Sequence, residues 1–244
     1  HAGPAVGRGG VPRRALGMGV VGDRMDGVAK FRAAGGRHID GAFEYRNHED
    51  IGRAVRASGV LRSEIFISTK IPSSMLGATL TAAAIERARA ELGMEYIDLV
   101  YIHTPGGGGA EDPSTQPCAR RGWRACRREA WAAIQQAIGE GRVRLGGVSN
   151  FGTALVDQLA PRPAVNQLEL HAWSPNRALL VPMRERGIAV VGSMHIMHIC
   201  ISCILSLNME HPGSYKFGQG TFTRALLLRE APSGIGRVQD NRAL

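Results

Sequence analysis

The residues best suited to chemistry in this sequence stand at the ends of short apolar runs. An acid, an amine and an imidazole each end a different run, and hydroxyl, amide and further acid groups end two more: Asp40, Lys70, His103, Ser149 with Asn150, and Gln167 with Glu169. Burying an ionisable group at the end of a strand costs on the order of several kcal/mol unless the group is paired. Five successive strands that end in this way therefore predict one shared polar site rather than five unrelated groups.

These polar ends belong to a regular alternation of strand-like and helical segments. Six apolar, β-branched runs are predicted as strands, at residues 37–40, 65–70, 97–103, 143–149, 164–168 and 188–191. Helical periodicity lies between them, at residues 47–57, 80–92, 129–138 and 179–186. We expect Asn47 to cap the first of these helices and Gly93 to end the second. This alternation requires parallel strands joined by right-handed crossovers.

A barrel accounts for the polar ends better than a doubly wound sheet does. In a parallel barrel the carboxyl ends of all strands share one rim. The turn after the first predicted strand also lacks the G-x-G-x-x-G fingerprint of the doubly wound dinucleotide-binding fold. We therefore expect an α/β fold of the (β/α)8 TIM-barrel type, in a single domain over residues 1–244. Six strands are two too few to close it, so the barrel is predicted to be incomplete after the sixth strand.

Four segments resemble signatures of the aldo-keto reductases, in the order and spacing of that family. They are GGRHIDGAFEYRNHEDIG (35–52), ELGMEYIDLVYIH (91–103), GRVRLGGVSNF (141–151) and AVNQLELH (164–171). A weaker match, VPRRALGMG (11–19), is similar to the opening hairpin of the family, so the resemblance covers residues 11–191. It implies an NAD(P)H-dependent oxidoreductase that reduces aldehydes or ketones to alcohols.

The resemblance implies a catalytic tetrad of Asp40, Tyr45, Lys70 and His103. Tyr45 is the implied donor of a proton to the carbonyl oxygen as hydride reaches the carbon. Because a free phenol has a pKa of about 10, Lys70 is expected to stabilise the phenolate and Asp40 to hold Lys70 charged. His103 is expected to direct a ring N–H at the carbonyl oxygen. Taken singly, the same residues also fit a structural ion pair, a loop tyrosine and a core histidine.

The resemblance also implies cofactor contacts at the strand ends. Ser149, Asn150 and Gln167 match the positions that hydrogen-bond the nicotinamide carboxamide, although Ser149 and Asn150 would equally suit a cap of the following helix. Near the end of the chain, Arg237 and Asn241 in RVQDN resemble the motif at the adenine end of the cofactor. NADP(H) is the expected cofactor, but NAD(H) stays open because the Lys-Ser turn for the 2′-phosphate is not found.

The sequence departs from the family after residue 191. Gly192 stands where the family has a tyrosine that stacks on the nicotinamide, while Ser193 matches. Loss of such a stack, worth roughly 1 kcal/mol, weakens cofactor binding without removing the tetrad. Residues 192–236 form an atypical segment, and residues 237–241 are a remnant of a cofactor loop. The alternative function is thus a non-catalytic cofactor-binding pseudoenzyme or a decayed fragment of the same family, and a chain that starts at His1 agrees with a fragment.

The charge balance does not indicate a nucleic-acid partner. The formal net charge is +9, but the arginines are scattered apart from one group, expected on a solvated loop: Arg120, Arg121, Arg124, Arg127 and Arg128. No aromatic stacking platform accompanies that group. The expected partner is a small-molecule carbonyl substrate, and we expect a monomer.

The cysteine pattern indicates a reducing compartment. Cys118, Cys126, Cys200 and Cys203 are too few and too unevenly spread for a disulfide framework, so we expect the cytoplasm.

A metal site and a membrane span are two alternative interpretations of residues in or next to the atypical segment, and neither is expected. His195, His198, Cys200 and Cys203 are zinc-ligand types, but they lack the intervening loop that lets two ligand pairs converge, so no metal is expected. Residues 188–207 carry no Asp, Glu, Lys or Arg and are long enough to span a bilayer. Their first third is a predicted buried strand and two histidines interrupt the rest, so no membrane partner is expected.

Overall fold

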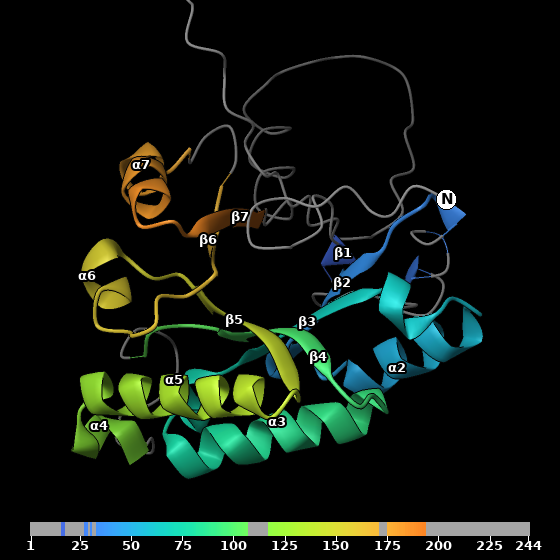
Figure 1. Cartoon of the computed structure of the whole chain (residues 1–244), viewed down its shortest axis with the longest axis horizontal. Coiled ribbons are helices and arrows are strands. Elements are labelled where there is room, and N and C mark those ends of the chain that lie inside the picture. Colours follow the sequence, from blue (N-terminus) through green and yellow to red (C-terminus); the bar gives the residue numbers. More distant parts are fainter. Residues whose placement is uncertain are drawn as a thin grey trace, which may run out of the picture.

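One curled, parallel β-sheet forms the centre of the molecule (Figure 1). The computed structural model describes residues 16–17, 27–28, 30, 33–106, 117–170 and 175–193. Seven strands follow one another in chain order, and every neighbouring pair is parallel. Their bounds are β1 Leu16–Gly17, β2 His38–Asp40, β3 Phe66–Ile71, β4 Ile97–Ile102, β5 Val143–Ser149, β6 Val165–Glu169 and β7 Ala189–Ser193. The prediction of a (β/α)8-type barrel is confirmed for the described residues, whose last strand is β7.

The first strand differs from the sequence expectation. The family resemblance implies an opening hairpin at residues 11–19, and the sequence predicts no strand of the barrel there. In the structure, Leu16 pairs with Ile39 and Gly17 with Asp40, both in parallel register. The described sheet therefore has seven strands, one more than the periodicity indicated, because a two-residue strand is too short to show an alternating pattern.

Helices connect successive strands and cover the outer face of the sheet (Figure 1). They are α2 His48–Ala57, α3 Ala78–Leu92, α4 Pro117–Arg121, α5 Trp123–Gly139, α6 Thr153–Val156 and α7 Arg177–Glu185, with 3-10 turns η2 Phe43–Tyr45, η3 Arg62–Glu64 and η4 Ser73–Met75. As expected, Gly93 ends α3 in the left-handed region, at a φ of 64°. Asn47 is the N-cap of α2, as expected, although its side chain makes no capping hydrogen bond.

The two faces of the sheet have different neighbours because side chains alternate along a strand. On β4, Val100 and Ile102 belong to an outer cluster that includes helix residues such as Ile85 and Ile134. Leu99 and Tyr101 belong instead to an inner cluster completed by side chains of β6 and β7: Val165, Ala189 and Val191. The outer cluster fixes the strands against the helices, and the inner face is left to present polar groups near the strand ends.

The group of arginines does not lie on a loop, contrary to the sequence expectation. Arg120 and Arg121 end α4, and Arg124, Arg127 and Arg128 lie in α5. Arg127 is buried, where it donates to the carbonyl of Pro105 at 2.9 Å and to the side chain of Gln158 at 2.9 Å. Five arginines between residues 120 and 128 obscured the amphipathic pattern of α5, whose apolar side packs on the sheet.

One disulfide links the start of this helical region. Cys118 in α4 is bonded to Cys126 in α5, and both side chains are buried. The cysteine pattern did not predict this disulfide, because helix packing brings together two residues that are eight positions apart.

The atypical segment contributes only its first residues to the described structure. Gly192 and Ser193 complete β7, while His195, His198, Cys200, Cys203, Arg237 and Asn241 lie outside the described residues. No helix within the described ranges combines the length and apolar character that crossing a membrane needs.

Candidate active site

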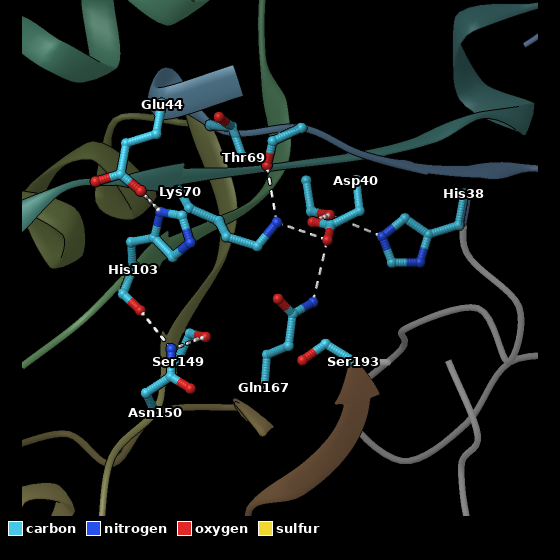
Figure 2. A network of polar contacts seen from close by, with 12 residues as sticks. His38, Asp40, Glu44, Thr69, Lys70, His103, Ser149, Asn150, Gln167 and Ser193 are labelled. Carbon is cyan, nitrogen blue, oxygen red and sulfur yellow. Dashed lines mark hydrogen bonds and ion pairs between the residues drawn. The ribbon is translucent and has the colours of Figure 1, made fainter. Parts of the chain in front are cut away.

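A buried acid–amine pair lies at the centre of the polar rim (Figure 2). Lys70 donates from Nζ to Oδ2 of Asp40 at 2.6 Å and to the carbonyl oxygen of Gly41 at 2.9 Å. Both side chains are almost fully buried, at 2% and 4% exposure. Strands β2 and β3 supply the two residues, and their parallel register sets Asp40 beside Ser68, two positions before Lys70.

The surroundings keep this pair charged. Burial raises the pKa of Asp40, but the charges of Lys70 and His38 and the hydrogen bonds from Lys70 and Ser68 outweigh it, so that the pKa lies below its ordinary value. Burial likewise lowers the pKa of Lys70, and the neighbouring Asp40 and Tyr45 reverse this effect, so that the pKa of Lys70 lies above its ordinary value. A lysine ammonium is thus held inside the protein, where its field is weakly screened.

Tyr45 and His103 lie next to the ammonium. Tyr45 ends the 3-10 turn η2 that follows β2, and the centre of its ring is 5.0 Å from Lys70 Nζ. His103 directly follows β4, and its backbone N–H donates to the carbonyl of Ile71 at 2.9 Å. The rings of Tyr45 and His103 meet edge to face, with centroids 5.9 Å apart. The four residues of the expected tetrad are therefore close together.

A second tyrosine, Tyr101, lies opposite Lys70 in the sheet register. It is completely buried, and its hydroxyl has no hydrogen-bond partner among the described residues. Burial, followed by the charge of Asp40, raises the pKa of Tyr101 well above the ordinary value of 10.0. Tyr101 is therefore a poor proton donor, although it is near the same lysine.

Glu44 adds a carboxylate to the open side of the site. Its Oε2 lies 3.0 Å from Nδ1 of His103 (Figure 2). The contact with His103 lowers the pKa of Glu44, against the raising effect of burial. Glu44 is 47% exposed, so its charge is partly screened by solvent.

The residues expected to contact the cofactor line the next strand ends. Asn150 donates from Nδ2 to the carbonyl of His103 and to Oγ of Ser149, each at 3.1 Å. Gln167 donates from Nε2 to Oδ2 of Asp40 at 3.1 Å. The alternative that Ser149 and Asn150 cap the next helix is wrong, because α6 begins at Thr153 with Gly152 as its cap. Ser149, Asn150 and Gln167 are instead connected to the acid–amine pair and to His103.

The last strand brings Ser193 to the same rim (Figure 2). Its Oγ donates to the carbonyl of Leu168 at 3.3 Å. Gly192 is buried, and a Cβ placed on it would lie 3.2 Å from Cβ of Leu170. A tyrosine at position 192 would therefore need Leu170 to move.

Besides Glu44 and Tyr101, the sequence reasoning missed two polar residues of this site, His38 and Ser68. Ser68 donates from Oγ to Oδ1 of Asp40 at 2.6 Å, and Nε2 of His38 lies 2.8 Å from the same Oγ. Each stands two positions before a tetrad residue on its own strand, so the period of two could have revealed them. Within the described part of the chain, no group of three or more His, Cys, Asp or Glu side chains is placed to hold a metal ion.

Comparison with known proteins gives a consistent result. A family model described as "Aldo/keto reductase family" matches residues 23–201. A "9,11-endoperoxide prostaglandin H2 reductase" of Trypanosoma cruzi is 38% identical over 161 residues, which cover 64% of this chain and 51% of the relative. A "Morphine 6-dehydrogenase" of Pseudomonas putida is 33% identical over 187 residues, covering 73% and 58%. The chain thus spans about half the length of these curated relatives.

Solved structures show the same relationship. An aldo/keto reductase of Brucella melitensis has a TM-score of 0.65 and 32% identity, with 74% of this chain and 66% of that chain covered. A Bombyx mori aldo-keto reductase in complex with NADP has a TM-score of 0.66 and 28% identity, with 79% and 66% covered. The family match extends over most of the chain, and the strand order agrees with it. The chain belongs to the aldo/keto reductase family.

Proposed function

We propose that this chain is an NADP(H)-dependent reductase of aldehydes or ketones, in which Tyr45 donates the proton. The observation that carries the proposal is the buried Lys70 ammonium, bonded to Asp40 at 2.6 Å and 5.0 Å from the ring centre of Tyr45. A positive charge at this place stabilises the phenolate that Tyr45 becomes when it gives up its proton. The neighbouring Tyr101 is less suited to this role, because its pKa is raised.

The donor set at the rim suits a nicotinamide carboxamide. Ser149, Asn150 and Gln167 offer hydroxyl and amide groups that both donate and accept hydrogen bonds. Since Nε2 of Gln167 already donates to Asp40, its Oε1 is the atom left to accept from a carboxamide. When bound, a reduced nicotinamide supplies the hydride. These three side chains would orient the ring toward the side on which Tyr45 and His103 lie.

The remaining residues act on the proton and the carbonyl oxygen. Tyr45 transfers its hydroxyl proton to the oxygen as negative charge develops there, and Lys70 stabilises the phenolate that remains. Asp40 holds Lys70 in the charged form. His103 would direct a ring N–H at the oxygen, and Glu44 contacts the other side of the site through Nδ1 of His103, 3.0 Å away.

The principal test uses one pair of tyrosine variants. Tyr45→Phe is expected to slow reduction of an aromatic aldehyde by about 100-fold or more, because general acid catalysis contributes at least that much. Its NADPH affinity, measured by quenching of tryptophan fluorescence, should stay within about twofold of the parent value, since no ground-state contact is removed. Tyr101→Phe is the matched control, since it removes a neighbouring buried hydroxyl, and it should reduce the aldehyde at the parent rate.

Other results would decide against the proposal. Equal rates for the parent chain and Tyr45→Phe would remove Tyr45 from the mechanism. Lys70→Met should slow turnover and displace the pH profile, because the phenolate loses its counter-charge. An unchanged profile would contradict the role of Lys70.

Gly192 supports one alternative, a cofactor-binding pseudoenzyme. No aromatic ring is present at position 192 to stack on a nicotinamide, and the site there is occupied by Leu170. NADPH binding by the parent chain without turnover of any aldehyde would favour this alternative, and no binding would favour a decayed copy. The shared polar network from Asp40 to Gln167 is the reason to prefer the enzyme.

The proposal includes a monomer that acts on a small-molecule carbonyl compound in the cytoplasm, with NAD(H) as the competing cofactor. In that compartment, Cys118 and Cys126 would be held as thiols rather than as the disulfide. Adding Arg237 and Asn241 as contacts to the adenine end completes the set of cofactor residues. Exchange of either residue for Ala should weaken NADPH binding without changing the rate of the bound complex.

A further inference from the structure

Two buried polar side chains lie behind the acid–amine pair, on the inner faces of adjacent strands. His38 and Asp40 are two positions apart on β2, and Ser68 and Lys70 are two positions apart on β3, so each pair shares one face. Asp40 is directly opposite Ser68 in the parallel register. His38 is 1% exposed and Ser68 is 0% exposed, so solvent does not compete for their hydrogen bonds.

Hydrogen bonds connect His38, Ser68 and Asp40 in a row, and the direction of each follows from the ionised carboxylate of Asp40. A carboxylate has no proton to give, so the single hydroxyl proton of Ser68 points at Oδ1 of Asp40, 2.6 Å away. The Oγ of Ser68 must then accept from His38, whose Nε2 lies 2.8 Å away. The imidazole is therefore protonated at Nε2. Phe66 packs edge to face against this ring, with centroids 4.7 Å apart, and holds its plane.

The row from His38 through Ser68 holds Oδ1 of Asp40, the carboxylate oxygen that Lys70 does not contact. Oδ2 accepts from Lys70 at 2.6 Å and from Gln167 at 3.1 Å, while Oδ1 accepts from Ser68. Rotation of the carboxylate away from Lys70 would break the bond to Ser68. If the Ser68 hydroxyl turned its proton away from Asp40, lone pairs of Oγ and Oδ1 would face each other. The N–H of His38 occupies the other side of Oγ, so the hydroxyl proton stays directed at Asp40.

We propose that Ser68 and His38 are a positioning pair, which holds the carboxylate of Asp40 in the orientation that binds Lys70. The inference rests on the proposed reductase function, because it gives the orientation of Lys70 a purpose. Neither residue touches the phenol or the expected carbonyl. Both act through Asp40, and the order of contacts is His38, Ser68, Asp40, Lys70 and Tyr45.

The neighbouring residue on β3 supplies a matched control. Thr69 is also a buried hydroxyl that is hydrogen-bonded to a histidine, with Oγ1 2.7 Å from Nε2 of His48. It lies on the face of the strand opposite to Ser68 and Lys70, and Nδ1 of the same His48 ring lies 2.8 Å from Glu91. Thr69→Val thus removes an equivalent hydrogen bond one position away, on the side of the helices.

The first readout does not depend on turnover. The sequence has three lysines, Lys30, Lys70 and Lys216, so lysine-labelled full-length chain gives three side-chain NMR signals, and Lys70→Met identifies one of them. In Ser68→Ala, the carboxylate is free to swing away, and the pKa of Lys70 should fall by about one unit. Ser68→Thr keeps the hydroxyl and should restore the parent titration. His38→Phe should lower the pKa of Lys70 as Ser68→Ala does, by a smaller amount.

The second readout is the reduction rate. Ser68→Ala should lower kcat about tenfold and leave the KM for NADPH within about twofold, because a displaced Lys70 ammonium stabilises the phenolate of Tyr45 less. Thr69→Val should change neither the pKa of Lys70 nor kcat. The positioning role is overturned if Lys70 titrates in Ser68→Ala as in the parent, or if Thr69→Val shifts it equally. A parent chain that reduces no aldehyde defeats the reductase proposal alone, since the NMR titration still decides the positioning role.

Discussion

The acid–amine pair leads to a quantitative prediction for Asp40→Asn. The change leaves the Lys70 ammonium buried at 2% exposure with an uncharged partner. Removing one member of a buried ion pair costs about 3–5 kcal/mol, most of it from the unpaired charge that remains. Gln167 and Gly41 still offer polar contacts to the same region, so the lower end of this range is expected.

The pH dependence of this loss follows from the pKa shifts. The lowered pKa of Asp40 contributes stability that is present above about pH 4 and is lost as the pH falls through the folded pKa. The raised pKa of Lys70 contributes stability that is present below about pH 10 and is lost as the pH rises through the folded pKa. In Asp40→Asn, burial acts on Lys70 without the carboxylate and lowers its pKa. The variant can then release the proton, and its deficit should shrink as the pH rises.

The assay is urea unfolding followed by far-UV circular dichroism, at about pH 6 and about pH 9.5, on either side of the expected release of the proton. Asp50→Asn is the matched control, because Asp50 pairs with Arg53 at the surface of α2 and the side chain of Arg53 is 55% exposed. Such a surface pair contributes about 0–1 kcal/mol. The reasoning is wrong if Asp40→Asn costs no more than Asp50→Asn, or if its deficit is the same at both pH values.

Two further predictions concern stability away from the reacting groups. Asp98, at 1% exposure, accepts from Arg62 at 2.6 Å and from Arg144 at 3.1 Å near the start of β4. Asp98→Ala should therefore lower the free energy of unfolding by about 3 kcal/mol. An unchanged kcat with a lower urea midpoint would bear this out, whereas a lost kcat with intact stability would contradict it. The disulfide that closes the short loop between Cys118 and Cys126 should stabilise the chain by about 2.5 kcal/mol. A reducing agent should lower the free energy of unfolding of the parent by this amount and leave a variant with Ala at both positions unchanged. Peptide mapping that finds two free thiols in oxidised protein would refute the pairing.

The sequence alone was sufficient for the strands that carry the site. Residues 65–70 and 97–103 are short runs rich in β-branched and aromatic residues between helical patterns, which is typical of buried parallel strands. The polar residues at their ends follow from the same pattern, because a parallel sheet brings these ends to one edge. The family resemblance then added Tyr45, which lies on a turn where no periodicity points to it.

Tertiary structure decided the contacts that periodicity does not encode. The register between β2 and β3 selects Ser68 as the partner of Asp40, and strand register is a property of two segments rather than of either one. The rotation of α5 about its axis buries Arg127 and leaves Arg124 and Arg128 on the same helix exposed. Packing of α4 on α5 likewise joins Cys118 to Cys126. Local patterns determined which residues face the interior, and the packing of whole elements determined which of those residues meet.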